Sequence, residues 1–173
     1  MIRVKPERIR AYSIKYAFNQ SLAVPAQVAF DWCTDYQPND FAIMKEKGRR
    51  DVQKITDDTI LLTETARKNN RSIKKTKLVR LNRPSLSWTN THIAGPNRHS
   101  QFLYKIVPEG KTRCRLHFQG LLVQYSRKPL NHHQLNRIAR EECREDSTVW
   151  RHLAAALKRQ RPIARSNSPI PNA

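Results

Sequence analysis

The fold of this chain is decided by residues 113–159, RCRLHFQGLLVQYSRKPLNHHQLNRIAREECREDSTVWRHLAAALKR. Residues 113–125 read as one long strand, and 126–130 as a short linker. Asn131 is a suitable helix N-cap, and Pro162 limits the helix at its other end. Between them apolar or acidic positions recur every three to four residues, which is typical of a helix with one buried face: Leu135, Ile138 or Ala139, Glu142, Asp146, Val149 or Trp150, Leu153 and Leu157. We therefore expect one long strand followed by one long helix over about 131–159.

Upstream of this segment, short strand-like runs alternate with turn residues. The turns are rich in Asn, Asp, Pro and Gly, the residue types that favour tight reversals of the chain. Strands at this spacing predict an antiparallel meander. Together with the last strand there are six of them, at 49–55, 60–66, 73–81, 86–93, 99–107 and 113–125.

The first part of the chain predicts one strand and two short helices. Tyr12, Ile14, Tyr16 and Phe18 alternate, as in a strand with one buried face that runs to about residue 24. Pro25 suits the first turn of a helix, and a second short helix is expected over about 39–44. The element order is β-α-α-β₆-α. It predicts an α+β, helix-grip fold in which a curved antiparallel seven-stranded sheet wraps around the long C-terminal helix and leaves a cavity.

Length and composition predict a single domain. We expect a basic N-terminal extension over 1–11, the folded domain over 12–160 and a disordered tail over 161–173, which has little apolar content. The formal net charge of +19 is spread along the chain and attracts anions of any kind. Three cysteines without CxxC spacing predict neither a disulfide framework nor a zinc site. No membrane span or signal peptide is evident, so a cytoplasmic protein, with possible attachment to a membrane surface, is expected.

Three motifs in the expected order carry a family resemblance. They are SLAVPAQVAF (21–30), YKIVPEGKTRCRL (104–116) and Trp150-x-x-Leu153-x-x-x-Leu157. Each resembles a local feature of the START-like, birch-pollen-allergen-like superfamily, which includes polyketide cyclases, coenzyme Q-binding proteins and lipid-transfer domains. The resemblance covers roughly residues 12–160. It implies a cavity-binding fold without specifying the ligand, since one fold hosts many functions.

Candidate site residues follow from the faces on which they are expected. Aromatic side chains on the inner faces predict a ligand cavity lined by Tyr16, Phe18, Trp88, Phe102, Tyr104, Phe118 and Trp150. Glu142 and Asp146 share one helical face, and His92 shares the face of Trp88. These three are the candidates for acid–base catalysis, although pairing with Arg residues on the helix flank is the favoured interpretation of the two carboxylates. No histidine spacing predicts a metal site, and no cofactor motif is present.

The basic run around 74–83 offers a further site. Alternation places Lys75 and Lys77 on one strand face and Lys74 and Arg80 on the other. Lys75, Lys77 and Arg80 are candidates for a cationic rim that meets anionic lipid headgroups.

Three functions remain open at this stage. The first is binding or transport of a small hydrophobic ligand, such as a lipid, quinone or polyketide-like molecule. The second is an enzyme with a cyclase- or dehydratase-like activity on a cavity-bound ligand. The third is nucleic-acid or anionic-surface binding, which rests on charge alone and is disfavoured because the aromatic residues are expected to face inward. The sequence makes no prediction about the oligomeric state.

Overall fold

The computed structural model describes residues 9–37, 40–45, 47–68 and 71–159. The element order confirms the predicted α+β arrangement. It is β1 (Arg10–Leu22), α1 (Ala26–Cys33), α2 (Asp40–Ile43), β2 (Gly48–Thr56), β3 (Thr59–Lys68), β4 (Arg71–Asn82), the 3₁₀ turn η1 (Arg83–Ser85), β5 (Ser87–Ala94), β6 (Gln101–Pro108), β7 (Cys114–Ser126) and α3 (His132–Arg159).

The domain boundary differs at the N-terminus. Arg10 and Ala11 were assigned to the basic extension, but they belong to β1, where they pair with Ser126 and Tyr125 of β7. The strand extends this far because β7 is long enough to supply backbone partners. The remainder of the predicted extension up to residue 8, and the predicted tail over 161–173, lie outside the described residues.

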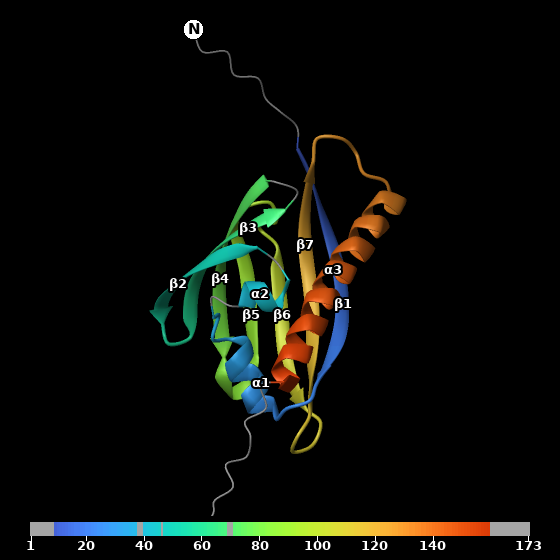
Figure 1. The fold of residues 1–173 in the computed structure, drawn as a ribbon. Coiled ribbons are helices and arrows are strands. Elements are labelled where there is room, and N and C mark those ends of the chain that lie inside the picture. The colour runs from blue at the N-terminus through green and yellow to red at the C-terminus, as the bar shows by residue number, and fades with distance from the viewer. Residues whose placement is uncertain (1–8, 38–39, 46, 69–70, 160–173) are drawn as a thin grey trace, which may run out of the picture.

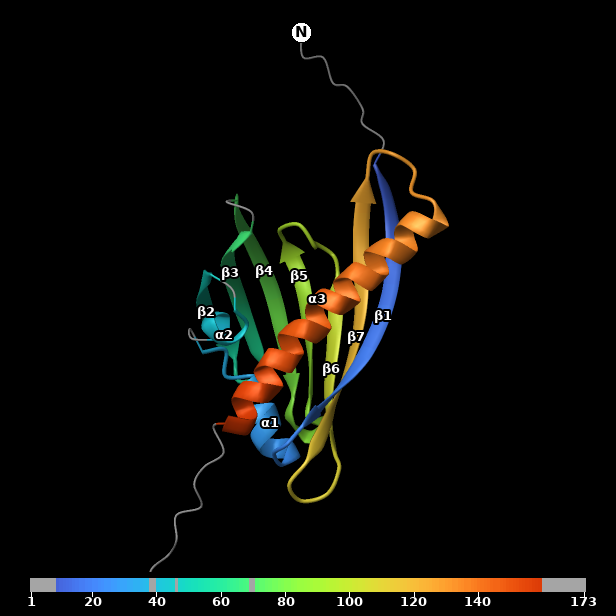
Figure 2. The same ribbon diagram turned by 45° about the vertical axis from the view of Figure 1, so that its right-hand side comes forward.

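The seven strands form one antiparallel sheet with the order β1-β7-β6-β5-β4-β3-β2. Strands β2 to β7 therefore follow one another as a meander, and β1 joins the sheet beside β7. Helix α3 crosses the inner side of the curved sheet diagonally, from the end where β1 and β7 lie toward α1, as Figures 1 and 2 show. Helix α2 lies beside β2, whereas α1 lies at the end of the sheet next to the C-terminal end of α3 and contacts β6 and β7. This is the predicted helix-grip arrangement, in which a curved sheet wraps around one long helix.

Helix α3 begins with a reciprocal cap. The backbone N–H of Gln134 donates to Asn131 Oδ1, and the backbone N–H of Asn131 donates to Gln134 Oε1, both at 2.9 Å. Such a pair satisfies backbone donors that the first helical turn leaves free. The predicted role of Asn131 as N-cap is confirmed.

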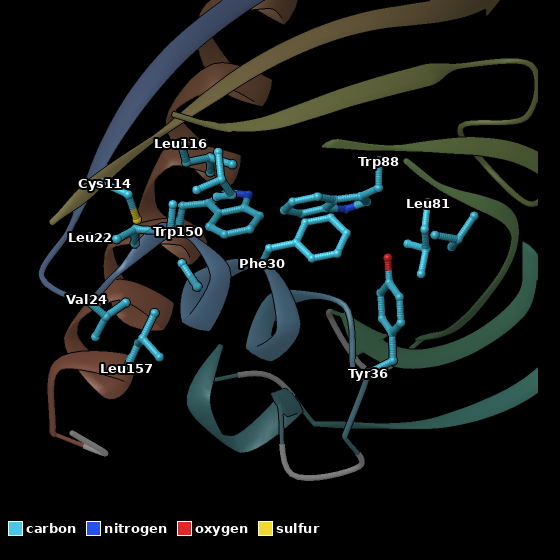
Figure 3. Close-up of a cluster of buried hydrophobic side chains, with 14 of the residues drawn as sticks. Leu22, Val24, Phe30, Tyr36, Leu81, Trp88, Cys114, Leu116, Trp150 and Leu157 are labelled. Atoms are coloured by element: carbon cyan, nitrogen blue, oxygen red, sulfur yellow. The ribbon is translucent and has the colours of Figure 1, made fainter. Parts of the chain in front are cut away.

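The densest core lies where α1 and the C-terminal half of α3 meet the sheet. Phe30 of α1 is fully buried, and its ring contacts Trp88 edge-on with a centroid distance of 5.8 Å. Trp150 of α3 also packs against Trp88, with a centroid distance of 6.2 Å. Figure 3 shows these rings together with Leu116 of β7. Burial of each such side chain stabilises the fold by roughly 1.5–3 kcal/mol, so this cluster contributes much to the free energy of unfolding. No helix in the described part of the chain is long and apolar enough to cross a membrane.

Candidate functional site

Two adjoining cavities lie between the inner face of the sheet and the helices α2 and α3. Their volumes are about 190 Å³ and about 710 Å³. Space remains here because α3 packs along β1, at the opposite edge of the sheet from β2 and β3. Ligand sites in proteins commonly measure about 300–1,000 Å³, so the larger cavity has a suitable size. The residues that line both are Met44, Ala66, Ile73, Lys75, Lys77, Tyr104, Asp146 and Val149.

An ion-pair cluster forms one wall of the smaller cavity. Glu64 of β3 is buried, with 8% of its surface exposed. It accepts hydrogen bonds from Arg50 of β2, through Nε at 3.0 Å and Nη2 at 2.7 Å, and its second oxygen pairs with Lys77 of β4. Arg50 also pairs with Asp40 of α2. The rings of Tyr36 and Phe41 lie 5.4 Å and 5.3 Å from the Arg50 guanidinium. Three elements are thereby fixed around one carboxylate.

The electrostatics of Glu64 follow from these partners. Burial alone would raise the pKa of its carboxyl group, but Lys77 and Arg50 outweigh that effect and lower the pKa to about 2. Glu64 is therefore ionised at neutral pH. It is bound on both oxygens and is consequently a structural anion.

His92 of β5 lies in the wall of the larger cavity. Its side chain is 5% exposed. Burial, together with nearby Lys77 and Lys75, lowers the pKa of its imidazole to about 3, so the ring is neutral. Its Nδ1 has no hydrogen-bond partner among the described residues, and the same holds for the Nδ1 of His152, which lines the same cavity from α3. Buried polar atoms are normally paired. Both nitrogens are themselves buried, so the two imidazoles are unusual in the wall of one cavity without exposing these atoms to it.

Asp146 of α3 lines both cavities. Its Oδ2 accepts a hydrogen bond of 2.7 Å from the Tyr16 hydroxyl of β1. Burial raises the pKa of the Asp146 carboxyl, while the bond from Tyr16 and the charges of Lys75 and Lys77 partly offset the rise. Burial also raises the pKa of Tyr16, with Asp146 adding to it, so that the phenol stays protonated and keeps donating. The contact fixes α3 to β1 at the side of the cavity.

The aromatic residues expected to line a cavity divide into two groups. Trp88, Tyr104 and Trp150 line the smaller cavity, and Phe102 and Tyr104 line the larger one. The remaining three, Tyr16, Phe18 and Phe118, contribute no surface to either cavity. The rings of Phe18 and Phe118 stack on each other with a centroid distance of 4.5 Å, beneath the part of the sheet that α3 covers. They face inward as expected, but α3 occupies the space in front of them.

The three candidate acid–base residues share the larger cavity, since Glu142, Asp146 and His92 all line it. The expected cationic rim does not exist as one surface. Lys75 and Lys77 lie in the walls of the internal cavities, whereas Arg80 is exposed. Strand alternation separates them, because positions 75 and 77 share one face of β4 and position 80 takes the other.

Sequence reasoning missed the cluster around Glu64. A signal for it was present: Glu64 alternates with Leu62 and Ala66, which places a carboxylate on the buried face of a strand. Lys75 and Lys77 stand in the same relation to Val79 and Leu81. The partners Arg50 and Asp40 carried no comparable signal, since they come from separate elements. Within the described ranges, no group of three or more His, Cys, Asp or Glu side chains is arranged to hold a metal ion.

Comparisons with solved structures identify the fold. The Zhui aromatase/cyclase from Streptomyces sp. R1128 superimposes with a TM-score of 0.69 at 9% identity, over 86% of this chain and 95% of that one. A START superfamily protein from Mycobacterium smegmatis gives 0.65 at 13% identity, over 84% and 97% of the two chains. This chain has the START-like, birch-pollen-allergen-like helix-grip fold.

A third similar structure is the norcoclaurine synthase from Thalictrum flavum, in complex with dopamine and hydroxybenzaldehyde. Its TM-score is 0.65 at 9% identity, over 87% of this chain and 89% of that one. No protein-family model matches the sequence of the helix-grip chain described here, and no curated protein sequence matches it significantly. At these identities the likeness concerns the fold, and it confirms the resemblance that the three sequence motifs indicated.

Proposed function

We propose that this helix-grip protein binds a small, largely apolar ligand in the larger internal cavity. The observation that carries the proposal is that cavity itself, about 710 Å³ in volume and lined by both apolar and polar side chains, Lys75 among the latter. Small-molecule sites combine apolar surface with polar groups that fix orientation, and in this cavity most of the lining side chains are polar or charged. Phe102, Tyr104 and Val149 supply the apolar part.

The fold neighbours support a ligand with aromatic character. One of them is a complex with dopamine and hydroxybenzaldehyde, and another is an aromatase/cyclase. The same fold thus accommodates aromatic molecules elsewhere. For this chain the class remains a proposal, and binding or transport of a lipid, quinone or polyketide-like molecule falls within it.

A cavity-filling variant tests the proposal. Ala66 lines both cavities, so Ala66→Phe places a ring in them. The neutral fluorophore N-phenyl-1-naphthylamine serves as the probe. We expect saturable binding to the wild type and at least tenfold weaker binding to Ala66→Phe. Ala17→Phe is the matched control, because Ala17 is exposed on the outer face of β1, and it should bind like the wild type.

Native mass spectrometry of the protein purified from its own host provides a second measurement. A retained small molecule supports the proposal and identifies the ligand after solvent extraction. Equal probe binding by both phenylalanine variants, or an unliganded mass with nucleic acid co-purifying until high salt removes it, would contradict it. The latter result would favour the charged surface instead.

A second candidate function, proton-transfer catalysis on a bound carbonyl compound, is favoured by one specific observation. The larger cavity combines a carboxyl group with a raised pKa, Asp146, and a neutral imidazole, His92. A weakly acidic carboxyl and a neutral base are the groups that general acid–base catalysis requires. A cyclase- or dehydratase-like reaction belongs to this class.

The extracted ligand distinguishes the two candidates. It is incubated with ligand-free wild type, with Asp146→Asn and with Glu141→Gln, an exposed carboxylate on the same helix. Conversion by the wild type and Glu141→Gln, but not by Asp146→Asn, would support catalysis. An unchanged ligand mass in all three would leave binding alone.

A further inference from the structure

We propose that the larger cavity recognises ligands through an acid group, and that the Lys75 ammonium binds this monoanion. The inference deepens the proposed function and rests on it. The ligand class is then an apolar, preferably aromatic molecule with one carboxylate or sulfonate-like group. The apolar part would lie toward Phe102 and Val149, and the acid group toward β4 and β5.

Lys75 lines the cavity, and the carboxylate expected to pair with it, that of Glu64, is already bound by other cations. In the register of β3 and β4 it lies directly opposite Glu64. Both oxygens of Glu64 are already bound, one by Arg50 and the other by Lys77. Lys75 forms no ion pair or side-chain hydrogen bond with any residue that the structure describes. A charged group at the wall of a cavity without an opposite charge favours an anionic ligand there.

A second acidic candidate, Asp146, does not neutralise Lys75. The charge of Lys75 lowers the pKa of Asp146, so the two groups sense each other. However, Asp146 Oδ2 is held by Tyr16 at 2.7 Å, and no ion pair between Asp146 and Lys75 forms. The carboxylate is directed to β1, at the far edge of the sheet. Lys75 therefore keeps its bonding capacity for a ligand.

Three further polar side chains line the same cavity as Lys75. Burial raises the pKa of Tyr104 well above its ordinary range, so its hydroxyl stays protonated on the wall that both cavities share. His92 and His152 also line the larger cavity, and His92 is more than nine-tenths buried. The Nδ1 of each imidazole is itself buried and has no hydrogen-bond partner among the described residues. Lys75 is thus the charged group that an acid group would meet in this cavity, with Tyr104 and the two imidazoles in the same lining.

The charge balance of the cavity points the same way. Basic side chains outnumber acidic ones in its lining, with exposed residues at the mouth contributing most of the excess. Such an arrangement raises the local concentration of anions and speeds their entry. The basic set is Lys45, Lys47, Arg67, Lys75, Lys77 and Arg144, and the acidic set is Glu142, Glu145 and Asp146.

A pair of matched fluorophores tests the inference. N-Phenyl-1-naphthylamine and 8-anilinonaphthalene-1-sulfonate share one apolar framework and differ by the sulfonate. Hydrogen bonds to charged groups contribute about 1.5–3 kcal/mol, so Lys75→Met should weaken sulfonate binding roughly 10- to 100-fold. Binding of the neutral probe should change less than about twofold. Methionine preserves the length of the side chain and therefore the shape of the wall.

Two further variants separate a specific contact from general attraction. Lys74→Met removes the same charge from an exposed position of the same strand, and it should leave both affinities unchanged. Lys75→Arg keeps the charge and should retain most of the sulfonate affinity. Equal weakening of both probes by Lys75→Met, or equal loss of sulfonate binding in Lys74→Met, would overturn the inference while leaving the cavity function intact. Failure of the wild type to bind either probe would overturn both proposals.

Discussion

The Glu64 carboxylate joins side chains from four elements, because Arg50 connects it to β2 and α2 and Lys77 connects it to β4. Removing one partner of a buried ion pair leaves the others charged and unpaired, which costs more than the pair itself contributes. At the residue scale, Glu64 therefore controls the shape of one cavity wall. Its contribution also depends on pH.

Glu64→Gln should destabilise the fold by about 3–5 kcal/mol at pH 7, since two cations lose their buried carboxylate. The pKa of Glu64 is about 2 in the folded protein and 4.5 ordinarily. Its stabilisation is therefore fully present above about pH 4.5 and is lost as the pH falls through about 2. The difference is worth about 3 kcal/mol. Urea denaturation between pH 7 and pH 3 measures both effects.

The exposed carboxylate Asp51 on the outer side of β2 provides the control. Asp51→Asn should follow the wild-type curve. Glu64→Gln should lose less stability on acidification than the wild type, because it lacks the group that protonates. A variant as stable as the wild type at pH 7, with the same pH dependence, would contradict the assigned role.

At the scale of elements, α3 is held on the sheet by a contact that depends on a residue without a side chain. Gly120 of β7 lies opposite Tyr16 of β1 in the strand register. A Cβ at Gly120 would come within 2.8 Å of the Tyr16 ring. The Tyr16 ring can approach the β7 backbone this closely because position 120 has no Cβ, and its hydroxyl donates to Asp146 of α3.

Gly120→Ala should therefore displace the Tyr16 ring and weaken its bond to Asp146. We expect a loss of about 1–3 kcal/mol in the free energy of unfolding, as for other overpacked cores. In the background of Tyr16→Leu, which removes the ring atoms concerned, the same glycine substitution should cost much less. Urea denaturation of the wild type, the two single variants and the double variant gives the coupling energy. Additive effects would show that the close approach has no energetic consequence.

At the scale of the whole molecule, the net positive charge destabilises the compact folded state. The formal net charge of +19 on 173 residues creates self-repulsion in the folded state. Salt screens this repulsion, with a Debye length of about 10 Å at 0.1 M. The ion pairs of Glu64 are buried and are screened less.

Raising NaCl from 0.02 M to 0.3 M should therefore stabilise the protein, by on the order of 1 kcal/mol or about 2–4 °C in Tm. Thermal unfolding followed by circular dichroism measures the shift. Sucrose at equal osmolality is the control for effects that do not involve charge. A Tm that falls with salt would mean that attractive surface pairs outweigh the net repulsion.

Much of the fold could be predicted from sequence because its signals are local. The alternation of Tyr12 to Phe18, the turn residues between later strands and the three-to-four spacing after Asn131 are each set by neighbours along the chain. Strand ends were predicted to within one or two residues, and the start of the folded domain moves to Arg10 because β1 pairs there with a strand more than a hundred residues away along the chain.

The sequence by itself determined the element order, the shared inner face of His92 and Trp88, and the shared strand face of Lys75 and Lys77, which were expected on a cationic rim and not in a cavity wall. Only the tertiary structure decided which of these line empty space and which are covered. Phe118 is buried because it stacks on Phe18 of β1, the strand along which α3 packs, whereas Lys75 faces a cavity because α3 leaves β4 uncovered. Likewise, whether an inward charge is neutralised depends on partners from other elements, as with Glu64 and Arg50. Periodicity carries no information about such long-range pairing, since packing sets it.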